Sequence, residues 1–453
     1  MTTNIFQNTA IENIQKTFNE QFNNAKGFSH LKDIKNLALN NFLKAGFPSK
    51  KSEQYKYTSL EQHFAGTYKY FPFSIEGRIN VDEIFKCDVP NLDTHLIILI
   101  NGWFYATSKQ NLLYETNQGI IYGSLLEAIN KYPEKVLQYI KLQNETNILD
   151  NLNMALMQDG LFVYIPKNTK LDKPIQVINL VVANEPVQIY PRHLFISESS
   201  NLTQILFCDH SLNASPFIMN GNINVILNKE AKLEFYRIQN AHNHSVQLTN
   251  NNIEQDEESY YKGIYITLHG GTVRNNINVN LNGTKATNEM YGLWLADKNQ
   301  HIDYYTEVKH RKPNCQSNQF FKSILDDEAT GIFSGKILVE KNAQKTNAYQ
   351  SNKNLIISPK AKVRSKPHLE IYADDVKCSH GSATGKLDDD AMFYLRSRGI
   401  SQKESCQLLM FAFASDITKQ ISLLPLKEEI DHLVNKRLRG ELSRCNRCSI
   451  TCC

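Results

Sequence analysis

Two side chains that can bind a transition metal stand one residue apart, at Cys378 and His380. In a β-strand, side chains two positions apart point to the same side, so a strand here would present a thiol and an imidazole together. Iron and zinc accept both ligand types. Two ligands do not complete a tetrahedral site, so a second chain must supply the others, or the site holds metal only in passing. The alternative interpretation is a buried cysteine that happens to adjoin a surface histidine.

A second group of thiols lies at the end of the sequence, where Cys445 and Cys448 have Cys-x-x-Cys spacing and Cys452 and Cys453 follow. This spacing is typical of zinc and iron–sulfur ligands. The adjacent Cys452 and Cys453 cannot easily both ligate one ion. Two interpretations therefore stay open: a segment that binds metal or handles a cluster transiently, and a flexible, incidental tail.

Other histidines have a simpler explanation than metal binding. His301 and Asp303 share a face by alternation, and His310 follows nearby. We expect these three residues to be hydrogen-bonded structural residues. His242 and His244 stand in a polar segment, and we expect them in a solvated turn.

Clustered carboxylates occur at Asp388–Asp390, and an acid–base mechanism on carbohydrate would need such a cluster. These aspartates stand where a helix is expected to begin, and the helix dipole favours acidic residues there. The sequence also contains no Gly-x-x-x-x-Gly-Lys-Ser/Thr run, so ATP hydrolysis cannot be assigned to this chain. We therefore expect no enzyme active site, and a β-helix carbohydrate-active enzyme is the alternative hypothesis.

The middle of the chain, from about 160 to 369, must position Cys378 and His380, and its pattern is that of strands. Ile277, Val279 and Leu281 alternate with asparagines, which is the period of a half-buried strand. A strand, a short polar turn and an inward small residue recur, and the interval from Ala343 to Ala361 suggests one coil of a β-solenoid. An antiparallel sandwich is the competing fold, but tight Asn-Gly hairpin signals are scarce.

Helical patterns flank these strands on both sides. The N-terminal helices are expected around Ile11–Phe22 and over Leu31–Ala45, where Gly46 ends the second one. After Asp390 a short helix ends at Gly399, and Ser401 with Glu404 forms a capping box for the next helix. We therefore divide the chain into a helical region with some strand (1–150), a parallel β-helix core (151–385) and a C-terminal helical region with the cysteine-rich tail (386–453).

Composition indicates a folded soluble protein, with 41% hydrophobic and 21% charged residues. The net charge of +4 is too small to indicate nucleic acid as the main partner. The N-terminus lacks the features of a signal peptide, and the longest apolar run is far shorter than the roughly 20 residues that span a bilayer. We expect a cytoplasmic protein, without membrane or nucleic-acid partners, whose nine cysteines stay reduced.

Several longer runs resemble one known family, and in chain order they are Glu53–Thr58, Gly331–Ile337, Ala343–Asn352, Lys366–Gly381 and Phe393–Ile400. Together they resemble the SufB/SufD family of iron–sulfur cluster scaffold proteins. Its SufB branch is expected to have acidic residues after the cysteine and the histidine, where this chain has Ser379 and Gly381, so the resemblance is to the SufD branch. Tyr55 stands where the family usually has tryptophan.

This resemblance implies a mainly β fold, a right-handed parallel β-helix flanked by α-helical regions at both ends. It also implies pairing with a SufB-like paralogue through the β-helices, with a homodimer expected in isolation. The cluster would form transiently at that interface, shared with SufB and not held permanently by this chain, with His380 contributing and Cys378 beside it.

The resemblance further implies that a SufC-like ATPase docks on the C-terminal helical region. The residues predicted to form that docking surface are Arg396, Arg398, Gly399, Ile400, Phe411 and Phe413. A homodimeric thiol- or metal-sensing protein that uses the C-terminal cysteines is the remaining alternative.

Overall fold

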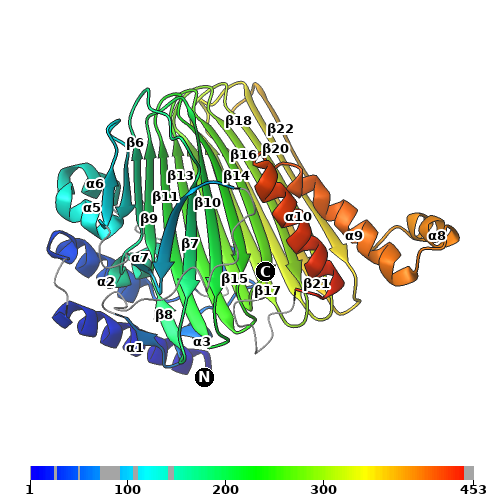
Figure 1. Cartoon of the computed structure of the whole chain (residues 1–453), viewed down its shortest axis with the longest axis horizontal. Coiled ribbons are helices and arrows are strands. Elements are labelled where there is room, and N and C mark those ends of the chain that lie inside the picture. Colours follow the sequence, from blue (N-terminus) through cyan, green and yellow to red (C-terminus); the bar gives the residue numbers. More distant parts are fainter. Residues whose placement is uncertain are drawn as a thin grey trace.

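The chain folds into a long β-solenoid of about eight turns with helices at both ends (Figure 1). The structure is a computed structural model, which describes residues 2–24, 28–48, 52–71, 92–105, 111–140 and 147–442. Successive strands alternate between two sheets, and the solenoid strands pair in parallel within each sheet. The mainly β fold and the β-helix predicted from the sequence are confirmed.

We name the two sheets sheet 1 and sheet 2. Sheet 1 contains the solenoid strands β6 (Leu161–Ile165), β9 (Arg192–Ser197), β11 (Phe217–Leu227), β13 (Ser245–Gln255), β15 (Thr272–Leu281), β17 (His301–His310), β19 (Thr330–Val339) and β21 (Lys362–Ile371). Sheet 2 contains β7 (Ile175–Val181), β10 (Leu202–Ser211), β12 (Lys232–Asn240), β14 (Tyr260–His269), β16 (Thr287–Ala296), β18 (Gln316–Leu325), β20 (Thr346–Ile356) and β22 (Val376–Gly385). The short β8 (Val187–Ile189) pairs with β11 and with β1 (Lys69–Tyr70).

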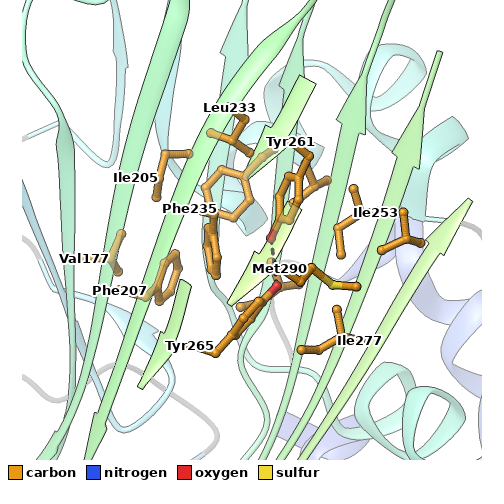
Figure 2. Close-up of a cluster of buried hydrophobic side chains, with 14 of the residues drawn as sticks. Val177, Ile205, Phe207, Leu233, Phe235, Ile253, Tyr261, Tyr265, Ile277 and Met290 are labelled. Atoms are coloured by element: carbon orange, nitrogen blue, oxygen red, sulfur yellow. Dashed lines mark hydrogen bonds between the residues drawn. The ribbon is translucent and has the colours of Figure 1, made fainter. Parts of the chain in front are cut away.

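The main core lies between the two sheets and consists of the alternating apolar residues (Figure 2). Ile277, Val279 and Leu281 are fully buried there, as their alternation predicted. Tyr261 and Tyr265 also point inward, and their hydroxyls hydrogen-bond each other at 2.8 Å. Each such buried side chain stabilises the fold by about 1.5–3 kcal/mol, so the stacked coils share one continuous source of stability.

One coil is longer than the sequence indicated. In sheet 1, Val246 is the register partner of Thr272, and His301 is the register partner of Thr330. The two residues of each pair lie one above the other, so they are one full coil apart along the chain. Ala343 and Ala361 are both buried, but they lie in the two turns on opposite sides of one coil. The prediction that these two alanines are a full coil apart was therefore wrong, because the strand–turn–small residue pattern occurs twice in each coil.

The N-terminal region closes one end of the solenoid. Its helices are α1 (Thr2–Asn24), η1 (Ser29–Leu31), α2 (Lys32–Ala45), η2 (Glu53–Tyr55), α3 (Glu61–Phe64), α5 (Leu125–Lys131), α6 (Pro133–Ile140) and α7 (Ile148–Leu156). Its strands are β2 (His95–Ile100), β3 (Trp103–Phe104), β4 (Leu113–Glu115) and β5 (Ile121–Ser124). β2 and β3 extend sheet 2, β4 and β5 extend sheet 1, and the short outermost strands β3 and β4 run antiparallel to their neighbours.

Within the described residues, three helices follow the last strand: α8 (Asp389–Ser397), α9 (Gln402–Thr418) and α10 (Leu424–Arg439). α9 and α10 cover the outer face of sheet 2, where Ile417 and Ile430 pack against apolar residues of the strands. The N-cap bond of the predicted capping box is present, because the Ser401 hydroxyl accepts a hydrogen bond from the Glu404 N–H at 3.2 Å, while the Glu404 carboxylate accepts from the Ser401 hydroxyl at 3.2 Å. α8 lies beyond the other end of the solenoid, away from the sheets (Figure 1).

Candidate functional site

The solenoid ends in two strands, β21 and β22, each of which has a neighbour on one side only within the described chain. Both strands have ten residues. Two exposed large hydrophobic residues lie there, Ile371 at the end of β21 and Tyr372 directly after it. We call this region the open end, because the described residues leave strand edges and the rim of the core uncovered there.

Cys378 and His380 lie on β22 at the open end, as the sequence predicted a strand there. Ser382, two residues further, hydrogen-bonds Ser365 of β21 across the space between the sheets at 2.7 Å. By strand alternation, His380 and Cys378 face the same inner side as Ser382. His380 is exposed, whereas Cys378 is half-buried. The structure therefore brings a thiol and an imidazole together at the rim of the core.

The inner lining of the open end has two halves. Around Cys378 it is apolar, with Ile337, Ala348 and Leu369 in the same cluster. Around His380 it is polar, and the residues that line this half are Gln350, Asn352, Asn354, Ser365 and Ser382. His380 and Cys378 thus stand where the polar half meets the apolar half.

The apolar half affects the thiol directly. Burial raises the pKa of the Cys378 thiol, and a hydrogen bond from the backbone of Ala348 offsets this only in part. The thiol is therefore the favoured form in the uncovered chain, and a positive metal ion would be needed to favour the thiolate. Among the described residues there is no group of three or more histidine, cysteine or acidic side chains that could hold a metal ion. The described part of the chain thus presents one thiol and one imidazole together at the open end.

The predicted docking residues lie on two different surfaces. Arg396, Arg398 and Gly399 are exposed at the end of α8 and just after it, and Ile400 is half-buried. Phe413 packs against sheet 2, with the Lys322 ammonium 4.0 Å from its ring centroid. Phe411 is half-buried against the same apolar cluster.

Two aromatic residues that we had not singled out are more exposed than these. Phe393 is 74% exposed and Tyr394 is 57% exposed, and none of the nine described residues of α8 is buried. Residue type alone could not separate them from Phe413, because the same aromatic residues occur in the core. Their exposure depends on how far α8 extends from the sheets.

His301 and Asp303 are structural, as predicted. Thr58 of the N-terminal region donates a hydrogen bond to Asp303 at 2.5 Å and lies 2.9 Å from His301 Nε2. Asp303 also forms a buried ion pair with Arg274, whose guanidinium lies 4.1 Å from the Tyr55 ring centroid. These contacts fix the Glu53–Thr58 run on the outer face of sheet 1.

The same run also reaches the open end. Glu53 forms an ion pair with Lys366 of β21, and the Arg364 guanidinium of β21 lies 5.6 Å from the Tyr57 ring centroid. These contacts are with the outer face of β21, because the inward residues of that strand alternate with them. The N-terminal region therefore supports the last strand of sheet 1.

The other candidate residues are also accounted for where the structure describes them. His310 is buried and shares one hydrogen bond with Ser317, with 2.8 Å between His310 Nε2 and the Ser317 hydroxyl oxygen. Burial lowers the pKa of His310 to about 4. His244 is exposed, but His242 is buried and lies 2.8 Å from the Ser215 carbonyl, so the prediction of a solvated turn was wrong for His242. Asp388 caps α8 by accepting from the Asp390 N–H at 2.9 Å.

The four cysteines of the tail, Cys445, Cys448, Cys452 and Cys453, lie outside the described residues. Their predicted role therefore stays a prediction. Among the helices that the structure describes, none is both long and apolar enough to cross a membrane.

Comparison with known proteins decides between the hypotheses. The family described as "SUF system FeS cluster assembly, SufBD core domain" matches residues 180–413, and the SufBD protein N-terminal region matches residues 11–177. This chain belongs to the SufBD family. The predicted resemblance to this family is therefore confirmed, and the matches cover both the solenoid and the N-terminal region.

Individual relatives agree with the SufBD assignment. The chain is 30% identical over 404 residues to an iron–sulfur cluster assembly SufBD family protein of Synechocystis, which covers 86% of this chain and 87% of the relative. It is 29% identical over 409 residues to the iron–sulfur cluster assembly protein SufD of Escherichia coli, covering 89% and 92%. The chloroplastic protein ABCI7 of Arabidopsis thaliana is 23% identical over 415 residues, covering 88% and 84%. The chain is thus a SufD-like member of the SufBD family.

Proposed function

We propose that this chain is the SufD-type subunit of a scaffold that builds iron–sulfur clusters, paired with a SufB-like paralogue at the open end. The observation that carries this proposal is the position of Cys378 and His380, two metal-ligand side chains at the one solenoid end whose full-length strands lack an outer neighbour in the described chain. The partner covers that end, and the cluster is the cargo assembled there.

Strand edges explain why a partner binds at this end. β21 and β22 expose a row of unpaired backbone groups, and a long uncovered edge is a template for pairing with another chain. A second parallel solenoid fits this edge, because its own last strands have the same repeat along the backbone. Two copies of this chain would meet in the same way when the paralogue is absent, which gives a homodimer in isolation.

The ligand pair explains why the cluster is shared. Iron in a cluster needs more ligands than the Cys378 thiolate and the His380 imidazole supply, so the paralogue provides the rest. Covering the open end also removes water from the polar half of its lining. A cluster bound in this way is held only while both subunits and the incoming iron and sulfide are in place, and this chain keeps none permanently.

The α8 helix is the proposed docking site of a SufC-like ATPase. Phe393 and Tyr394 are exposed on a helix that contributes nothing buried among its described residues, and Arg396 and Arg398 add positive charge beside them. Aromatic and arginine side chains are enriched among the residues that dominate binding at protein interfaces. ATP hydrolysis belongs to that partner, because this sequence lacks the phosphate-binding loop, and we infer no catalysis by this chain.

The experiment is an anaerobic purification of the chain co-expressed with a SufB-like and a SufC-like protein, followed by iron and sulfide quantification. We expect His380→Ala to lower cluster content strongly and Cys378→Ala to lower it less. The reason is that a neutral imidazole binds iron without losing a proton, whereas burial raises the pKa of the Cys378 thiol. The control is His368→Ala, since His368 is an exposed histidine of β21, in the opposite sheet, and it bonds Glu370 instead.

Two outcomes would contradict the proposal. A SufB-like protein that elutes separately from this chain at micromolar concentration would remove the pairing. Normal cluster content in an intact His380→Ala complex would remove the histidine as an essential ligand and place the site wholly on the paralogue.

A further inference from the structure

Gln350 is a buried amide without a hydrogen-bond partner in the part of the chain that the structure describes. Its side chain is 2% exposed, and neither its Nε2 nor its Oε1 is bonded. Buried polar side chains in folded proteins are nearly always bonded, so an amide with both ends free requires an explanation. The position of the amide supplies one.

Gln350 is the direct neighbour of His380 in the last ladder of sheet 2. The register of β20 and β22 pairs these two residues, and neighbouring strands of a sheet are about 4.8 Å apart. Paired residues of a parallel ladder point to the same side, so the Gln350 amide lies inside the solenoid one layer below the imidazole. It extends over Gly335 of β19, where an added Cβ would overlap the amide group. The glycine thus leaves the space that the amide occupies.

The other polar side chains around this amide are at least partly bonded. Ser365 and Ser382 hydrogen-bond each other across the open end at 2.7 Å. Gln319, one coil deeper in the same column, accepts a hydrogen bond from Thr306 at 2.7 Å. Pro367, the register partner of Gly335, has neither a polar side chain nor a backbone N–H. Among the described residues, Gln350 is the buried amide with both ends unbonded.

We propose that Gln350 is a positioning residue for His380, whose side-chain oxygen accepts one imidazole N–H and thereby directs the other ring nitrogen at the iron of the nascent cluster. This inference rests on the proposed function. A histidine that ligates a metal almost always donates its second N–H to an oxygen, which fixes the tautomer and the ring orientation. If the partner covers the open end as proposed and excludes water, that oxygen comes from the protein.

The test compares two matched substitutions in the complex with the SufB-like and SufC-like partners. Methionine is close to glutamine in length and shape, so Gln350→Met removes the amide with little change in packing. We expect the chain to keep or gain thermal stability, because an unbonded buried amide is removed. We expect cluster content to fall about tenfold, the low end of the loss seen when such a supporting residue is removed.

Gln319→Met is the matched control, because it removes an amide one coil deeper whose oxygen is bonded to Thr306 while its Nε2 is unbonded. This substitution is expected to lower thermal stability, since Thr306 loses its partner, and to leave cluster content per complex unchanged. Gln350→Glu keeps an acceptor oxygen at the same place, and it is expected to restore at least half of the wild-type cluster content. A purely structural role for Gln350 predicts the opposite pattern, with stability and cluster content falling together.

The outcomes separate this inference from the function on which it rests. Wild-type cluster content in Gln350→Met, together with loss in His380→Ala, overturns the positioning role and keeps the proposed function. A lower melting temperature in Gln350→Met, comparable to that in Gln319→Met, also overturns it. Unchanged cluster content in His380→Ala itself would defeat the proposed function, whatever Gln350 does.

Discussion

The two ends of the solenoid solve the problem of exposed strand edges differently. At the N-terminal end the outermost described strands, β3 and β4, have only two and three residues, and they run antiparallel to their neighbours. Short edges of this kind resist pairing with other chains. At the open end β21 and β22 have ten residues each, and within the described chain no strand lies beyond them.

The buried polar residues differ in the same way. Near the N-terminal end, Asp150 of α7 accepts from Arg192 at 2.8 Å and from Asn222 at 2.6 Å. At the open end, Gln350 is buried without such a partner in the described chain. The N-terminal end therefore pairs its buried charges within the chain, although Arg192 Nε and Nη2 stay unbonded, whereas the open end leaves two strand edges and an amide with both ends unbonded among the described residues. Substitutions at the two ends should accordingly change different properties.

The largest effect is expected at the N-terminal end, from Asp150→Ala. Arg192 is 1% exposed, and this substitution leaves its guanidinium buried without a counter-charge. Breaking a buried ion pair in this way costs about 3–5 kcal/mol of unfolding free energy. Urea unfolding of the isolated chain measures the loss.

Asp150→Leu combined with Arg192→Met is the control, since it removes both charges. Apolar replacement of a whole buried pair is often neutral, so the double variant should recover at least half of the loss. Binding of the SufB-like partner should be unchanged in any variant that stays folded. A folded variant that no longer bound the partner would contradict the separation of the two ends.

The next effect is expected at the open end, from Ile371→Asp combined with Tyr372→Asp. Both residues are exposed, at 40% and 64%, so the stability of the chain should change little. Removing two apolar contacts and burying charge at an interface should weaken pairing with the SufB-like partner by about 3 kcal/mol, or roughly 100-fold. Isothermal titration calorimetry with the purified partner measures this.

Leu112→Asp is the matched control, because Leu112 is an exposed apolar residue, at 43%, beside β4 near the other end. This variant should bind the partner normally. Equal weakening by both sets of substitutions would show that pairing is not confined to the open end.

The strand core was predictable from the sequence, whereas the size of a coil was not. Alternation placed Ile277 and Val279 inside correctly, because the solvent-facing side of that strand is polar. The sequence interval from Ala343 to Ala361 corresponds to half a coil and not to a full one, because each coil has two turns and both need a small inward residue. Only the register between strands shows which turns lie above one another.

The placement of Cys378 and His380 on one strand was predictable, but their surroundings were not. Spacing alone put Cys378 and His380 on one face of a strand. The support from Tyr55 and Thr58 comes from a distant part of the sequence, as the contact between Thr58 and His301 shows, and no local pattern reveals it. The unbonded amide of Gln350 could not be predicted either. Whether a buried amide has a hydrogen-bond partner depends on all the side chains that pack around it, and these come from several strands.

A smaller effect is expected for Tyr394→Ala on α8. Truncating an exposed aromatic residue that becomes buried by a partner costs about 2 kcal/mol of binding, or roughly 30-fold in affinity. Because Tyr394 is 57% exposed, the unfolding free energy should stay within about 0.5 kcal/mol. Surface plasmon resonance with a SufC-like ATPase measures the affinity.

Phe413→Ala makes the opposite prediction and is the contrasting variant. Phe413 packs on sheet 2, and the Lys322 ammonium bonds its backbone carbonyl at 2.9 Å. Its truncation should lower stability more than it lowers affinity for the ATPase. The docking surface would have to be moved from α8 to α9 if Phe413→Ala, and not Tyr394→Ala, weakened binding in a folded chain.

The smallest effect is expected for Lys35→Met in the N-terminal region, and it depends on pH. Lys35 is 1% exposed, and burial, with a smaller contribution from Arg192, holds its pKa well below the ordinary value of 10.5. Its ammonium bonds the Met157 carbonyl at 2.7 Å, but Gln21 also bonds that carbonyl, so methionine leaves it satisfied.

Between the lowered pKa and 10.5 the unfolded chain binds more protons than the folded chain, so the stability of the wild type rises with pH across this window. Lys35→Met should therefore gain about 1 kcal/mol at pH 7 and less at pH 10, as measured by urea unfolding at both values. Lys32→Met changes an exposed residue of the same helix, so it should neither gain stability nor make stability depend differently on pH. If Lys35→Met gained more stability at pH 10 than at pH 7, the assignment of a buried, destabilising amine would be contradicted.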